Sequence, residues 1–167
     1  LERLCQKTDI YGLSGIDRYL ITTASALHDI GKVAIDDRIL NAHDLTPEQT
    51  AILHTHPILG AQMLENLSQY QDEPLVKFAI QICRWHHERW DGSGYPDGRK
   101  GDDIPIAAQV VALADAYDGL TGKRDKREAL SQEEAVAELT AGKHGAFNPL
   151  LLECLRDVED RLTEEAD

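Results

Sequence analysis

The chain has 167 residues, which fits a single domain large enough to bury a hydrophobic core. A hydrophobic content of 42% beside 28% charged residues is typical of a soluble globular protein, and no apolar stretch approaches the roughly 18 residues of a membrane-spanning helix. The formal net charge of -13 argues against non-specific nucleic-acid binding, which requires a basic surface. It does not exclude an anionic small ligand held by metals or local cations.

Helical patterns begin early in the chain. Apolar residues on a helical stripe predict a helix over 16–30, with Gly31 as its stop. A second helix start is predicted at Thr46, which can cap, followed by Pro47 at a favoured first position. Gln49 completes a capping box with Thr46.

The same pattern continues toward the C-terminus. Further helices are expected over 75–85, 106–121 and 131–141, and from Asn148-Pro149 into the acidic C-terminus. Ser131 and Glu134 form another capping box. Residues 91–103 are rich in Gly, Pro and Asp and predict an ordered loop. No alternating segment indicates a sheet, so we expect one all-α domain.

The three cysteines indicate the cellular location of this domain, and the first residue indicates its place in a longer protein. Cys5, Cys83 and Cys154 are far apart and form no CxxC pair, which favours reduced thiols and a cytoplasmic location. The chain begins with Leu1 rather than methionine. We therefore expect a fragment of a longer protein.

Six histidine and aspartate residues are candidate metal ligands: His28, Asp29, His56, His86, His87 and Asp115. Imidazole and carboxylate together suit Fe, Mn or Zn. Neighbouring residues of a helix point about 100° apart, so His28 and Asp29 suit two adjacent metals better than one. The two oxygens of Asp29 could bridge them.

Each candidate taken alone can also be explained without a metal. A single histidine is more often a hydrogen-bonded core or surface residue, and His54 is kept in that class because it lies on another face from His56. His86 and His87 are adjacent and lie between two tryptophans, and burying such a pair in a hydrophobic core is energetically unfavourable. Asp115 lies among apolar residues, where an unpaired carboxylate is expensive to bury. Taken jointly, the residues favour a metal cluster.

Five segments resemble the motifs of one family, in order and over nearly the whole chain: HDIGK (28–32), HPILGAQML (56–64), HHERWDGSGYP (86–96), LADAYDGLT (113–121) and GAFNP (145–149). The first resembles the signature of the HD phosphohydrolase superfamily, and the third that of its HD-GYP subfamily. In the last, Asn148 stands where Asp is usual. The resemblance implies that residues 1–167 form one all-α, HD-domain-like helical bundle. The ordered loop that contains Gly94-Tyr95-Pro96 would be its GYP loop.

The resemblance also implies an activity. HD-GYP domains of this kind hydrolyse cyclic di-GMP to linear pGpG, with onward hydrolysis to GMP left open here. The six candidate ligands match the family's metal ligands, which hold two or three divalent ions, Fe or Mn by preference. Lys32 matches the lysine near the scissile phosphate, so Asp29 and Lys32 are the expected catalytic residues.

Substrate contacts and partners follow from the same resemblance. Arg124 and Arg127 match positions that bind the ligand's phosphates; without the motif, solvated helix-end charges would explain both arginines equally well. Gly92, Tyr95 and Pro96 match the loop that shapes the substrate pocket, where Tyr95 is expected to pack rather than react. The family further implies an upstream sensor or receiver domain, docking of diguanylate cyclases at the GYP loop, and a homodimer.

Two departures keep alternatives open. Family members usually carry a ligand histidine well upstream, yet no histidine precedes His28. The segment 123–131 has Asp125 and Lys126 where Pro and Tyr are usual. The chain could therefore be a degenerate module that acts through protein contacts, or an HD hydrolase of another nucleotide.

Overall fold

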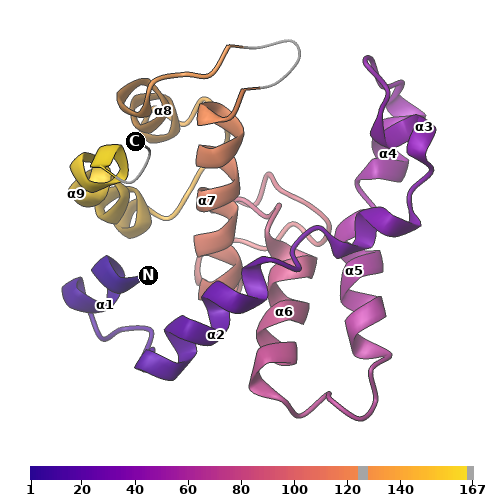
Figure 1. Ribbon diagram of the computed structural model, residues 1–167, viewed down its shortest axis with the longest axis horizontal. Helices are drawn as coiled ribbons and strands as arrows, with labels where there is room; N and C mark the ends of the chain where they lie inside the picture. The colour runs from indigo at the N-terminus through magenta and orange to yellow at the C-terminus, as the bar shows by residue number, and fades with distance from the viewer. Residues whose placement is uncertain (124–127, 165–167) are drawn as a thin grey trace.

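The computed structural model describes residues 1–123 and 128–164, with 160–164 as backbone only (Figure 1). The regular structure in these ranges is helical, apart from one isolated bridge between Lys143 and Gly145, which confirms the all-α prediction. In these same ranges, no helix is long and apolar enough to cross a membrane. The elements are α1 Glu2–Lys7, α2 Gly15–Ser25, the 3₁₀ helix η1 Ile30–Ala34, α3 Asp37–Leu40, α4 Pro47–Leu53, α5 His56–Glu65, α6 Pro74–Trp85, the 3₁₀ helix η2 Gly101–Asp103, α7 Ile106–Thr121, α8 Gln132–Thr140 and α9 Pro149–Glu164.

Helix α7 is the central element and belongs to two hydrophobic clusters (Figure 1). Its residues Leu113 and Leu120 pack with α1, α8 and α9 on one side. Its residues Ala107 and Val111 pack with α2, α5 and α6 on the other. Because α7 joins the two clusters, it sets the position of Asp115, which it carries, relative to the segments that carry the histidines.

Most predicted helix starts are confirmed. Thr46 and Gln49 form the expected capping box at the start of α4, and Ser131 and Glu134 form the one at α8. The observed helix α7 has the predicted bounds. The starts of α4 and α8 depend on side chains that bond backbone groups within three residues, and so they can be predicted from sequence.

The predicted helix over 16–30 is wrong in its last five residues. Helix α2 ends at Ser25, and the chain continues through tight turns into η1. Gly31 is not a helix stop: a Cβ there would lie 2.0 Å from the carbonyl oxygen of His56 and 2.5 Å from the nitrogen of Gly60. The glycine is needed because η1 and α5 touch backbone to backbone, which is a tertiary contact.

Asn148, the departure in the closing motif, is buried and fully used. Its amide donates to the Tyr11 hydroxyl and to Gln109 Oε1, both at 2.8 Å. Its Oδ1 accepts from the backbone nitrogen of Leu150 in the first turn of α9, as expected for the start of this helix. An aspartate could not supply the two donated bonds, because an ionised carboxylate only accepts.

Candidate metal centre

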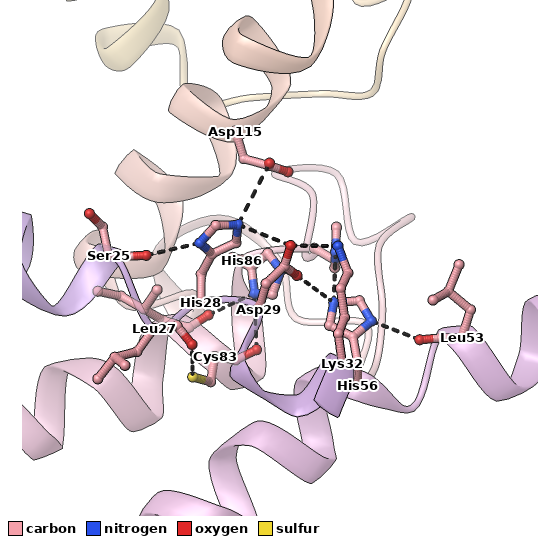
Figure 2. Close-up of polar contacts among 12 residues, drawn as sticks. Ser25, Leu27, His28, Asp29, Lys32, Leu53, His56, Cys83, His86 and Asp115 are labelled. Atoms are coloured by element: carbon pink, nitrogen blue, oxygen red, sulfur yellow. Dashed lines mark hydrogen bonds and ion pairs between the residues drawn. The ribbon is translucent and has the colours of Figure 1, made fainter. Parts of the chain in front are cut away.

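The six candidate ligands come from four separate places in the chain. His28 and Asp29 lie in the turn between α2 and η1, not on a helix as predicted. His56 begins α5, and His86 and His87 directly follow α6. Asp115 lies on α7. The fold brings them to one face of the bundle, where Figure 2 shows Asp29 among His28, His56 and Lys32.

Four of the six form a tight group. Asp29, His56, His86 and His87 each offer one ligand atom, and these atoms lie within 4.8 Å of one another. The Oδ1 atom of Asp29 lies 3.2 Å from His56 Nε2 and 3.8 Å from His86 Nε2. Asp29 Oδ1 and His86 Nε2 are both buried without a hydrogen-bond partner among the described residues. Buried polar atoms of this kind need a partner, and a cation at this point would provide one.

The other oxygen of Asp29 faces a second group. Its Oδ2 lies 3.3 Å from His28 Nε2 and 2.5 Å from the ammonium of Lys32. His28 Nε2 in turn lies 3.8 Å from Asp115 Oδ1. Asp29 is therefore the one carboxylate shared by both groups, an arrangement that suits a bridge between two cations.

Asp115 differs from its prediction in one respect. We expected a carboxylate that is costly to bury, but its side chain is 38% exposed. Its helix buries the neighbouring Leu113 and leaves Ala114 in solvent. The desolvation argument therefore does not hold for Asp115, and its place in the candidate site depends on its distance from His28.

The charge state of the group suits metal binding. Burial would raise the pKa of Asp29, but its contacts with His28, His56 and Lys32 outweigh burial and hold the pKa well below its usual range. Burial lowers the pKa of His86 to about 4 and that of His87 to about 2. An ionised carboxylate and neutral imidazoles are the forms that coordinate divalent metals.

The GYP loop is attached to the histidine pair by a buried carboxylate. Glu88 is 2% exposed, and it accepts from the backbone nitrogens of Asp97 (2.7 Å) and Arg99 (3.0 Å). Gly94 lies so close that a Cβ would be 2.4 Å from the His87 carbonyl oxygen. Sequence reasoning assigns Glu88 no role, and its position directly after His86-His87 is the only signal for it.

Asp97 fastens the same loop to the end of α6. Its carboxylate receives two hydrogen bonds from Arg84, at 2.8 and 3.0 Å, and one from the indole of Trp85 at 2.8 Å. The guanidinium of Arg99 lies 3.9 Å from the centroid of the same indole ring. Arg84 and Trp85 at the end of α6 thus hold the loop through Asp97 and Arg99. This agrees with the ordered loop that the composition predicted.

The predicted substrate-binding residues lie partly near the candidate ligands and partly outside the described residues. Tyr95, joined to Pro96 by a cis peptide bond, stacks on the ring of His87 at a centroid distance of 4.7 Å. Gly92 has a φ of +84°, which favours glycine. Arg124 and Arg127 lie outside the described residues. His54, which we expected to lie outside the site, stacks on Tyr95.

Comparisons with known proteins agree with this geometry. The HD domain family model matches residues 2–150. A Vibrio cholerae protein named "Probable cyclic di-GMP phosphodiesterase" is 42% identical over 161 residues, which is 95% of this chain and 36% of the relative. Another from Vibrio cholerae, named "3'3'-cGAMP-specific phosphodiesterase 2", is 42% identical over 152 residues, 90% of this chain and 28% of the relative.

A solved structure is also similar. It belongs to an HDG"Y"P protein from Bdellovibrio bacteriovorus, with a TM-score of 0.67 and 26% identity over 93% of this chain and 47% of that one. The present chain thus spans less than half the length of each of these proteins. The family match and the motifs lead to one conclusion: the chain belongs to the HD domain family, and its predicted likeness to HD-GYP proteins is confirmed.

Proposed function

We propose that this domain is a metal-dependent phosphodiesterase that hydrolyses cyclic di-GMP to pGpG, and to GMP where the second phosphodiester is also cut. The observation that carries the proposal is the group of Asp29, His56, His86 and His87, whose ligand atoms lie within 4.8 Å of one another. The relative named a cyclic di-GMP phosphodiesterase, 42% identical over 161 residues, supports the same substrate.

The proposed cofactor is a set of two or three divalent ions, Fe or Mn. Asp29, His56, His86 and His87 would hold one ion, and His28, Asp29 and Asp115 would hold another. Divalent ions in such a site supply Lewis acidity toward phosphoryl oxygens and acidify a water molecule.

The protein's own groups would orient the substrate. Lys32 places a positive charge beside Asp29, at the side of the group that is open to solvent, where it can meet a non-bridging phosphate oxygen. Arg124 and Arg127 are proposed to hold the phosphates of the dinucleotide, and Gly92, Tyr95 and Pro96 to form a wall of its pocket. Asp29 has the central role, because removal of its carboxylate would affect both groups of ligands.

A second candidate substrate is 3'3'-cGAMP. The relative named as specific for it is also 42% identical to this chain, over 152 residues. Both cyclic dinucleotides carry the same two phosphodiester groups, so the metal group and Lys32 would serve either one. Discrimination would depend on contacts to the second base.

The alternative from another functional class is a domain that has no catalytic turnover and acts through protein contacts. The group of His28, Asp29 and Asp115 offers three ligands, one fewer than the group of Asp29, His56, His86 and His87. Partners proposed from the resemblance are a sensor or receiver domain, diguanylate cyclases and a second copy of the chain. These stay predictions.

The test is anaerobic purification followed by metal analysis and product detection with both dinucleotides. Two or more Fe or Mn ions per chain, with pGpG formed from cyclic di-GMP, would support the proposal. Faster hydrolysis of 3'3'-cGAMP would favour the second candidate. Metal-loaded protein that hydrolyses neither dinucleotide would contradict the proposed activity.

A further inference from the structure

Three of the four histidines at the candidate centre are oriented in the same way. The Nδ1 atom of His28 lies 2.9 Å from the Ser25 carbonyl oxygen, and that of His56 lies 2.7 Å from the Leu53 carbonyl oxygen. His86 Nδ1 lies 2.9 Å from the carbonyl oxygen of Ile82. Because a carbonyl only accepts, Nδ1 donates in each case, and Nε2 is the nitrogen left to face the centre.

His87 is held differently. Throughout residues 1–123 and 128–164, no hydrogen bond from its Nδ1 to a carbonyl is found. Its imidazole instead stacks on the ring of Tyr95, with centroids 4.7 Å apart and planes inclined by 19°. Tyr95 is also joined to His87 through the backbone, where its nitrogen donates to the His87 carbonyl oxygen at 3.3 Å. The ring stack therefore restrains the orientation of the His87 ring, as a carbonyl contact does for the other three histidines, but it does not select which nitrogen carries the proton.

The Tyr95 ring is in turn stacked on His54. These two centroids are 3.9 Å apart and the planes are inclined by only 10°, a closer and flatter contact than the one to His87. Tyr95 thus lies between two imidazoles. His54 is the C-cap residue of α4, three residues before the buried Pro57 at the start of α5, so its backbone is fixed by two helices.

We propose that His54 is a positioning residue, which clamps Tyr95 against His87 and so keeps His87 Nε2 at its 3.2 Å separation from His56 Nε2. It acts through the face of its ring and not through a nitrogen. An aromatic ring of another type can therefore replace it, whereas a small side chain cannot. The inference rests on the proposed function only in requiring that the centre binds a divalent metal.

The experiment compares Mn²⁺ binding to metal-stripped protein by isothermal titration calorimetry. His54→Ala should weaken binding roughly 2- to 10-fold, the range that corresponds to the loss of one aromatic pair. His54→Phe should bind within about twofold of the unchanged protein, since it keeps the stack. Ile52→Ala is the matched control, because it shortens an exposed side chain on the same helix and should leave binding unchanged.

A Tyr95→Ala background makes the test sharper. If His54 acts through Tyr95, His54→Ala should have no further effect on Mn²⁺ binding in that background. Unchanged binding by His54→Ala alone would overturn the inference, as would a His54→Phe variant that binds as weakly as His54→Ala. Thermal unfolding of each metal-stripped variant shows whether it is folded.

The inference and the proposed function can fail separately. Mn²⁺ binding without hydrolysis of either dinucleotide contradicts the proposed activity, yet the affinities of the variants still decide the role of His54. Full hydrolysis together with equal Mn²⁺ affinity of His54→Ala and the unchanged protein supports the activity and overturns the positioning role.

Discussion

His87 Nε2 lies 3.2 Å from His56 Nε2, although the two residues are 31 positions apart in the chain. His56 directs its Nδ1 to a backbone carbonyl, so its Nε2 carries a lone pair toward His87. In the metal-free protein His87 can donate from Nε2 to that lone pair. With Asp29 Oδ1 also 3.2 Å from His56, the same three atoms would serve as ligands of a divalent cation.

Metal binding should therefore stabilise the fold. At a free metal concentration 100 times the dissociation constant, the stabilisation is about 2.7 kcal/mol, because only the folded chain brings the ligands together. Thermal unfolding of the metal-stripped protein, with and without Mn²⁺, measures it. Mg²⁺ serves as control, since it prefers oxygen ligands and should raise the melting temperature less. An equal effect of both ions would argue against a histidine site.

Asp29→Ala should abolish metal binding and hydrolysis together. Its two oxygens face His56 and His28, so the substitution removes one ligand from each side of the candidate centre. Metal content per chain and product formation are the measurements, with circular dichroism as the check on helix content. Full activity of this variant would exclude the site as the catalytic centre.

Gly31→Ala should destabilise the protein by about 1–3 kcal/mol or more, since the added methyl group would overlap the backbone of His56 and Gly60. Gly15→Ala is the matched control. At Gly15 the nearest atom to a Cβ is a flexible Arg18 nitrogen 3.5 Å away, so we expect no loss and a gain of up to about 1 kcal/mol. Urea unfolding of the two variants distinguishes them, and a neutral Gly31→Ala would contradict the close approach of η1 and α5.

Glu88→Gln should cost about 1–3 kcal/mol of unfolding free energy. The buried carboxylate accepts two backbone N–H groups, and an amide would turn one of its acceptor atoms into a donor. Glu65→Gln, at an exposed position, should change the free energy by less than about 0.5 kcal/mol. Urea denaturation provides the comparison. Equal stability of both variants would mean that Glu88 does not hold the GYP loop.

Asp97 should make stability depend on pH in the acid range. Its hydrogen bonds from Arg84 lower its pKa in the folded state; burial opposes them, and the hydrogen bond from Trp85 lowers the pKa further. A lowered folded pKa gives stability that is present above the unfolded value of about 3.9 and is lost as the pH falls below it. The stability difference between the unchanged protein and Asp97→Asn should therefore shrink below about pH 4.

Urea midpoints of the two metal-stripped proteins between pH 3 and 7 measure this difference. The subtraction removes the other carboxyl groups, which titrate in both proteins. A difference that stays constant over the whole range would show that the Asp97 charge does not contribute to the contact with Arg84.

Local sequence signals determined most of the helical framework and the identity of the candidate ligands. The capping boxes at Thr46 and Ser131 and the bounds of α7 were predicted correctly, because these features depend on hydrogen bonds and apolar spacing within a few residues. Order and spacing of the motifs likewise identified the six ligand candidates, since the type of a side chain limits which metals it can bind.

The tertiary structure alone decided how those parts meet. It ended α2 at Ser25, where the chain turns to press Gly31 against the backbone of His56, and it left Asp115 partly exposed. It also stacked His54 on Tyr95, a pair 41 positions apart whose contact no local pattern encodes. Such contacts depend on how helices pack in three dimensions, and packing is set by the summed shape of many side chains rather than by any short segment.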